Sequence, residues 1–148
     1  MPERPPPVAQ ALLLADFIHR DARNGKYDVY GVFNLVGCPH FPTTLPDPWV
    51  YVALTEIYGP TPVQVRVVSA DEDGACFAAD LTADAPDPLT VVEAAFPVRN
   101  VSFTNPGLYR LQLVADEVVI AERRFQLIAT DHLIRGPGAA LAPDISPP

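Results

Sequence analysis

The sequence predicts an all-β fold, an antiparallel β-sandwich of about eight strands. Eighteen prolines cut the 148 residues into short segments. Proline disrupts helix interiors and cannot donate to a sheet ladder, so it marks the ends of regular elements. Between the prolines, apolar and polar residues alternate with a period of two, which is typical of strands that turn one face to a core.

The expected strands follow one another at the spacing of a sandwich. Residues 9–23 favour a strand over a helix, although their alanines and leucines also have good helix propensity. Asn24-Gly25 is a strong hairpin signal and directly precedes a strand at Tyr27–Leu35. Asp116 and Glu117 fall where a tight turn would join the last two long strands. Later strands are expected at Trp49–Tyr58, Val63–Val67, Phe77–Leu81, Leu89–Phe96, Val101–Phe103, Tyr109–Leu113 and Phe125–Leu127.

The composition indicates one globular domain with extended ends. Hydrophobic residues make up 49% of the chain, which leaves room for a core. Because prolines cluster at both ends, we expect tails at residues 1–8 and 136–148 around a single domain at 9–135. Ten Lys and Arg against 18 Asp and Glu give a formal net charge of −8. This charge opposes binding to nucleic acid or anionic lipid, so neither is an expected partner.

The sequence also indicates a cytoplasmic protein. Residues 1–7 lack the basic segment, apolar stretch and cleavage site of a signal peptide, and no apolar run approaches the roughly 18 residues of a membrane span. In a reducing compartment, Cys38 and Cys76 should remain thiols, and neither is expected to be essential. Cys76 should point outward because Phe77 belongs to the inward-facing set, whereas Cys38 lies in a proline-rich connection.

One turn carries a recognisable motif. Asn105, Pro106, Gly107 and Tyr109 resemble the tyrosine corner of immunoglobulin-like sandwiches, in which the phenol oxygen bonds to backbone a few residues upstream. The resemblance makes the predicted sandwich immunoglobulin-like. The alternative is an ordinary Pro-Gly turn followed by a core tyrosine. Leu111 stands where antibody domains carry a cysteine, so no disulfide between the sheets is implied.

A wider resemblance covers nearly the whole ordered part. It rests on Ala11–Asp16, Asp21, Gly25, Lys26, Tyr30–Phe33, the Pro-Gly-Leu-Tyr turn, Asp116 and Phe125. In these positions the chain is similar to a family of short, uncharacterised bacterial proteins known only as a domain of unknown function. The resemblance implies a small β-sandwich and no known activity. Asn24 stands where that family would carry threonine.

Residues with chemical potential are few. Ser69, Ser102 and Ser146 lie outside any Gly-x-Ser-x-Gly elbow, which argues against a serine hydrolase. Cys38 and His40 place a thiol near an imidazole in sequence, but no third group and no ligand spacing accompanies them. The acidic run Asp71–Asp73 lacks the ligand pattern of a calcium loop and reads as a polar turn. We therefore predict no catalytic residue, no cofactor and no metal site.

An apolar surface is the remaining candidate site. In the strand that begins at Trp49, the alternation leaves Trp49, Tyr51 and Ile57 outside the core. In the preceding long strand, Tyr30 and Val32 lie opposite the better core face. If the two strands are neighbours, Tyr30, Val32, Trp49 and Tyr51 form an outer aromatic patch of the kind that anchors interfaces. A second copy, a different protein or one of the chain's own tails would then cover it.

Two classes of function follow from the sequence. The first is a non-catalytic protein-interaction or assembly module, either bound to a protein partner or self-associated. The alternative is a small metal- or thiol-dependent enzyme that uses Cys38 and His40 or the acidic turn Asp71–Asp73. The sequence favours the first class because it contains an apolar outer patch and no recognisable catalytic set.

Overall fold

The computed structural model describes residues 4–70 and 74–130, and this part of the chain is all β. Its strands are β1 (Val8–Arg20), β2 (Tyr27–Val32), β3 (Leu35–Cys38), β4 (Thr43–Thr44), β5 (Trp49–Thr55), β6 (Thr61–Ser69), β7 (Ala75–Ala83), β8 (Val92–Pro97), β9 (Ser102–Phe103), β10 (Gly107–Ala115) and β11 (Val118–Ala129). The first segment is a strand, as predicted. No helix in the described part is long and apolar enough to cross a membrane.

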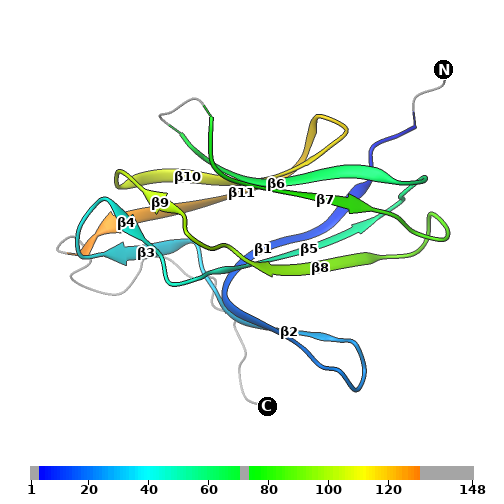
Figure 1. Cartoon of the computed structure of the whole chain (residues 1–148), viewed down its shortest axis with the longest axis horizontal. Helices are drawn as coiled ribbons and strands as arrows, with labels where there is room; N and C mark the ends of the chain where they lie inside the picture. The colour runs from blue at the N-terminus through cyan, green and yellow to red at the C-terminus, as the bar shows by residue number, and fades with distance from the viewer. Residues whose placement is uncertain (1–3, 71–73, 131–148) are drawn as a thin grey trace, which may run out of the picture.

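The strands form two sheets that pack face to face (Figure 1). Sheet A has the order β2-β1-β5-β8, and sheet B has the order β3-β11-β10-β6-β7. A short ladder of β4 and β9 lies at one end of the sandwich. The pairs are antiparallel except for β3 with β11, which run parallel. The predicted antiparallel sandwich is confirmed, with one parallel pair added at the edge of sheet B.

Side chains from both sheets fill the space between them. In β5, Val50, Val52 and Leu54 are 3% exposed or less, and the inward valines of β6 are equally buried. These are the faces that the alternating sequence predicted. The outward position predicted for Ile57 is wrong: β5 ends at Thr55, so the alternation does not extend to Ile57, which is 1% exposed in the core. Further members of the core are Leu12 and Leu14 of β1, Leu111 and Leu113 of β10, and Phe125 and Leu127 of β11. Each such side chain contributes roughly 1.5–3 kcal/mol on burial, so this layer is the main source of stability.

The tyrosine corner is present. Tyr109 is 5% exposed, and its hydroxyl donates a 2.6 Å hydrogen bond to the backbone oxygen of Asn105. Its ring stacks on Phe125, with centroids 5.6 Å apart, and meets the edge of Phe103 at 5.0 Å. Leu111, at the position of the antibody cysteine, is completely buried. The corner thus fixes the start of β10 against both the turn and the core.

One segment passes directly from sheet A to sheet B. The predicted strand Tyr27–Leu35 is interrupted after Val32, where β2 ends, and β3 begins at Leu35. Between them, the Phe33 amide donates to the Leu14 oxygen in sheet A at 3.1 Å. The Asn34 oxygen accepts from the Gln126 amide in sheet B at 2.8 Å. The segment therefore joins the two sheets along one flank.

The N-terminal segment is anchored near the start of β1, and the β1–β2 hairpin lies at the other end of this strand. The Arg4 guanidinium bonds both carboxylate oxygens of Asp116, at 3.0 and 3.2 Å, and the Pro60 oxygen at 2.6 Å. Asp116 and Glu117 form the predicted two-residue turn between β10 and β11. Both have positive φ, 49° and 66°, as a type I′ turn requires.

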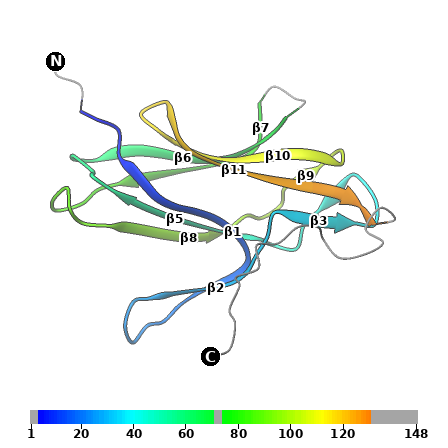
Figure 2. The ribbon, with the colours of Figure 1, turned by 180° about the vertical axis from the view of Figure 1, so that it is seen from behind.

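The β1–β2 hairpin forms a ribbon of residues 16–32 that leaves the sandwich. Pairing of β1 with β5 ends at Ala15 and Trp49, whereas pairing of β1 with β2 continues from Ala15 to Arg20. The ribbon runs on the side of sheet A that faces away from sheet B in both views (Figures 1 and 2). At its tip, the Asp21 amide donates to the Lys26 oxygen at 2.8 Å, and Gly25 has φ of 73°. The hairpin signal at Asn24-Gly25 is confirmed.

Candidate interaction surface

The outer face of sheet A, which points away from sheet B, is strongly apolar. The register brings together Ala11, Leu13 and Ala15 of β1, Trp49, Tyr51 and Ala53 of β5, and Glu93, Ala95 and Pro97 of β8. Glu93 is the one charged member of this set. Water contact with so much apolar surface is unfavourable, which explains why another part of the chain packs there.

The ribbon extends over the side of this face beyond Ala15, where β1 stops pairing with β5 and continues with β2 (Figures 1 and 2). Gly31 has φ of +68°, and a Cβ at this position would lie 2.3 Å from Oδ2 of Asp16. The positive φ favours glycine, and a larger residue would also have to displace the exposed Asp16 side chain. Beyond Ala15, Ile18 is only 3% exposed, and the Tyr27 ring meets the Tyr51 ring edge-on at 5.5 Å. The ribbon is therefore packed against sheet A.

A chain of four side chains, one from each strand of sheet A, holds the ribbon in place. The Arg20 guanidinium lies 5.7 Å from the centroid of the Tyr27 ring, a cation–π geometry. Tyr27 packs on Tyr51, whose hydroxyl donates a hydrogen bond to Oε2 of Glu93. Burial and this carboxylate raise the pKa of Tyr51 above its ordinary value. We call Arg20, Tyr27, Tyr51 and Glu93 the latch.

Where the ribbon joins the body, three aromatic rings form a row. Phe17 meets the Trp49 ring edge-on at 5.7 Å and lies 6.2 Å from the Tyr30 ring. Phe17 is 49% exposed, Tyr30 54% and Val32 48%, whereas Trp49 is half-buried. We call Phe17, Tyr30, Val32 and Trp49 the ribbon patch. The ring contacts link Phe17, Tyr30 and Trp49, and Val32 lies two residues after Tyr30 in β2.

The four residues singled out from sequence occupy two environments. Tyr30 and Val32 are exposed on the ribbon, whereas Trp49 and Tyr51 lie half-buried beneath it. β2 and β5 are not neighbours, because β1 lies between them in sheet A. Phe17 of β1 bridges this gap, and the sequence analysis missed it. The hairpin signal could have indicated it, because a hairpin there places Phe17 across from β2.

The described part of the N-terminal segment lies far from the patch. Val8 pairs with Thr55, six residues along β5 from Trp49, which corresponds to about 20 Å of extended strand. Arg4 is anchored further still, at the β10–β11 turn. The described N-terminal residues therefore leave the ribbon patch open. The C-terminal tail predicted at 136–148 lies outside the described residues.

Comparison with known protein families assigns this chain to one of them. A family model for a family of unknown function, DUF6941, matches residues 10–128. The chain belongs to DUF6941. The match extends from β1 into β11, so it includes the whole ribbon, the latch and the patch. A comparison with curated proteins finds no match.

Two of the other chemical candidates in this DUF6941 chain, Cys38 and His40, fall within the described residues. Cys38 is 3% exposed at the end of β3, and burial raises its pKa, the opposite of what a thiolate nucleophile needs. His40 is exposed. Across residues 4–70 and 74–130, no three His, Cys, Asp or Glu side chains are grouped as a metal site would require. The acidic turn Asp71–Asp73 lies outside the described residues.

The two cysteines of the DUF6941 fold are widely separated. Cys38 is on β3 and Cys76 on β7, which are opposite edges of sheet B. Four strand spacings of about 4.8 Å separate these edges, whereas a disulfide needs Cα atoms within roughly 7 Å. Cys76 is exposed, as predicted, and its Sγ lies 3.4 Å from the Val67 oxygen. This geometry rules out a bridge between them in the folded chain.

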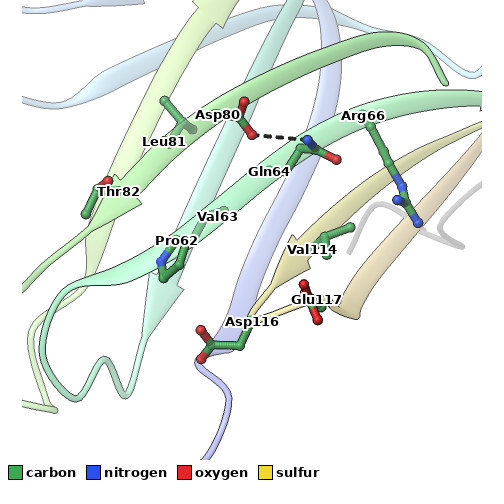
Figure 3. A pocket seen from close by; sticks show the side chains of 10 residues that line it. All are labelled: Pro62, Val63, Gln64, Arg66, Asp80, Leu81, Thr82, Val114, Asp116 and Glu117. Carbon is green, nitrogen blue, oxygen red and sulfur yellow. Dashed lines mark hydrogen bonds between the residues drawn. The ribbon is translucent and has the colours of Figure 1, made fainter.

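A shallow groove of about 790 Å³ lies on the outer face of sheet B, beside the β10–β11 turn (Figure 3). Polar side chains that line the groove or lie beside it form hydrogen bonds. Gln64 donates to Asp80 at 3.1 Å, and Arg66 donates to Gln112 at 2.8 Å, which in turn donates to Glu122 at 2.8 Å. This face of the DUF6941 sandwich is a solvated polar ladder and contrasts with the apolar outer face of sheet A.

Proposed function

We propose that this DUF6941 protein is a non-catalytic interaction module that binds protein through the ribbon patch. The observation that carries the proposal is the exposure of Phe17, Tyr30 and Val32, each about half open to water. The rings of Phe17 and Tyr30 are 6.2 Å apart, and Val32 lies two residues after Tyr30 in β2. Contiguous apolar patches on soluble proteins mark interaction sites, and aromatic side chains are preferred interface anchors.

Side chains beneath the patch hold it in one shape, which is expected of a binding site. Trp49 backs Phe17, and the latch fixes the ribbon to β5 and β8 through Tyr51 and Glu93. A surface held in one shape loses less conformational freedom when a partner binds. On sheet B, by contrast, side chains of the outer face form hydrogen-bonded polar pairs, and the exposed apolar residues Val118 and Val119 lie at the start of β11, next to the turn.

The proposal places this activity in the cytoplasm. Cys38 and Cys76 lie on opposite edges of sheet B, too far apart to form a disulfide with one another. Thiols persist in reducing compartments, and this arrangement is compatible with one.

A photo-crosslinking amino acid at position 30, in the full chain and in the source cells, tests the proposal. The matched control carries the same amino acid in place of Arg124, an exposed residue on the outer face of sheet B. We expect a discrete protein adduct from position 30, and we expect Val32→Ser in the same chain to remove it. Position 124 should give no such adduct. Equal adducts from both positions, or none from position 30, would refute the proposal.

Serine at Tyr30 and Val32 separates this role from a structural one. Both side chains are about half exposed, so the change should leave the unfolding midpoint nearly unchanged while binding is lost. Trp49→Ser and Tyr51→Ser should weaken binding and also lower the unfolding midpoint, because these rings are half-buried under the ribbon.

A further inference from the structure

We propose that the open edge of β7 binds an extended, basic segment of a partner protein, which adds to sheet B as an antiparallel strand. This surface is separate from the ribbon patch. β2 and β3 lie at the flank where Phe33 and Asn34 join the two sheets, and β8 and β7 are the edge strands at the opposite flank (Figure 1). Within the described residues, β7 pairs only with β6.

The edge of β7 lacks the features that usually protect an edge strand. Natural edges are shortened, distorted, or blocked by proline and lysine. β3 has only four residues, Gly31 distorts the end of β2 with φ of 68°, and β8 ends at Pro97. In contrast, β7 has nine residues and contains no Pro, Gly, Lys or Arg. Its register shift lies near its start, so Phe77–Ala83 pairs regularly with β6.

The register shows which backbone groups of β7 are open. In an antiparallel ladder, successive residues turn their amide and carbonyl groups alternately toward the two sides of the strand. The Ala70 amide bonds to the Leu108 oxygen, so the even-numbered residues of β6 face β10 and the odd-numbered ones face β7. These odd-numbered residues pair with odd-numbered residues of β7. The amides and carbonyls of Ala78, Asp80 and Thr82 therefore point to the open edge.

The inner side of this flank is apolar. Phe77 and Leu81 of β7, and Val92 and Phe96 of β8, are only partly buried against the core. An added strand would cover these side chains with every second residue of its own. The outer side of β7 carries the exposed carboxylate of Asp80. A segment that fits this edge therefore alternates apolar residues, which face inward, with polar residues, which face outward.

The charge around the edge favours a basic occupant. Residues 67–98, which include β7, β8 and the connection between them, contain seven Asp and Glu and no Lys or Arg. The remaining eleven Asp and Glu are nearly balanced by the ten Lys and Arg, so this stretch carries most of the net charge of −8. Arg66 of β6 lies beside Ala78 in the register, but it donates to Gln112 on the side away from β7. Lysine or arginine in a partner strand would meet complementary charge here.

The same charge argues against two other occupants. A second copy of the chain would bring this acidic stretch against itself. Residues 131–148 contain Arg135 but also Asp131 and Asp144, so they are not basic. They also follow β11, whose end pairs with β3 at the opposite edge of sheet B. A basic segment of a partner protein is therefore the occupant that the backbone groups, the apolar side chains and the charge favour together.

Hydrogen exchange of the full chain, followed amide by amide, tests the proposal with a synthetic peptide. The peptide matches β7 in length and alternates lysine with valine. In the free chain, the amides of Ala78, Asp80 and Thr82 should exchange quickly, whereas those of Ala79 and Leu81 should exchange slowly because they face β6. At roughly millimolar peptide, where weak interfaces form, we expect exchange of the three open amides to slow about ten-fold.

Two N-methylated peptides are the matched controls. Residues directly opposite one another in a ladder turn their side chains to the same face, so the peptide residues that bond to Ala78, Asp80 and Thr82 are the outward-facing lysines. N-methyl groups on the lysines should therefore abolish the protection. N-methyl groups on the valines, whose amides point away from β7, should leave it. A peptide with glutamate in place of lysine should give no protection.

Two variants of the chain test the charge. Asp80→Lys should weaken peptide binding about ten-fold, because a lysine of the peptide then lies beside a like charge. Asp28→Lys makes the same change on β2, at the opposite flank, and should leave binding unchanged. Equal losses in the two variants would overturn the assignment of the peptide to this edge.

Three further outcomes would overturn the proposal. The first is equal protection by both N-methylated peptides, and the second is no protection by the lysine peptide. The third is protection of the open amides in the free chain. Such protection would identify a second copy if it rises with chain concentration, and another part of the same chain if it does not.

Discussion

Removing the hydroxyl or the ring of Tyr109 should destabilise the protein by two distinct amounts. Tyr109→Phe deletes only the 2.6 Å hydrogen bond to the Asn105 oxygen, and such a bond contributes about 1 kcal/mol. Tyr109→Ala also removes a ring that is 5% exposed and packed between Phe103 and Phe125. Loss of a buried aromatic ring costs about 3–5 kcal/mol, because a cavity remains.

Urea unfolding followed by far-UV circular dichroism measures both effects. For a domain of this size the unfolding free energy falls by about 2 kcal/mol per molar urea. Tyr109→Phe should therefore lower the midpoint by about 0.5 M, and Tyr109→Ala by about 1.5–2.5 M, with similar slopes. If Tyr109→Ala proves too unstable to purify, Tyr109→Leu retains part of the volume and should fall between the two.

Tyr58→Phe is the matched control. Tyr58 is 45% exposed and lies in the connection between β5 and β6, so loss of its hydroxyl should leave the midpoint unchanged. An unchanged midpoint for Tyr109→Ala would show that the corner does not stabilise the fold. Equal shifts of the midpoint for Tyr58→Phe and Tyr109→Phe would show that the hydrogen bond to Asn105 does not stabilise the fold.

The remaining predictions concern the cysteines, Gly31 and the latch. A thiol reagent should modify Cys76 at once and Cys38 only after denaturation, because Cys38 is 3% exposed; two fast thiols would contradict this burial. Gly31→Ala should cost about 1–2 kcal/mol in urea unfolding because of its positive φ, and a neutral result would mean that this conformation is not required. The raised pKa of Tyr51 means that the folded chain holds this proton more tightly, so stability should fall as the pH rises above the ordinary tyrosine pKa of about 10. Tyr51→Phe should make stability fall less steeply as the pH rises. Identical profiles of stability against pH for this variant and the unmodified chain would show that Tyr51 does not cause the fall.

The alternation of the sequence predicted which faces of the strands are buried. Val50 and Val52 point inward and Trp49 and Tyr51 outward, as the period of two requires. The corner at Tyr109 and the turn at Asp116 were equally readable, because both depend on local chemistry: a Pro-Gly turn before an inward tyrosine, and polar residues between two long strands. Local periodicity and turn residues are therefore sufficient to predict the buried strand faces, the tyrosine corner and the β10–β11 turn.

The ribbon was not predictable in the same way. Both faces of β1 are apolar, since one packs in the core and the other lies beneath the ribbon, so alternation is weak there. A two-residue turn at Asn24-Gly25 would pair Phe17 with Val32, whereas the longer loop pairs Phe17 with Tyr30. The interruption after Val32 depends on backbone hydrogen bonds that Phe33 and Asn34 make with Leu14 and Gln126, which are tertiary contacts. These are the reasons that Phe17 was missed.

The attachment of the ribbon makes it replaceable. Ala15 and Val32 face one another where it joins the sandwich, and the chain then continues directly into β3. Residues can be added or removed beyond this pair without moving the core, provided that both strands change together. One residue in each strand would turn the row of rings to the opposite side, and two would return it. The sandwich can thus carry ribbons of different length and side chains on an unchanged frame, much as loops vary on a rigid scaffold.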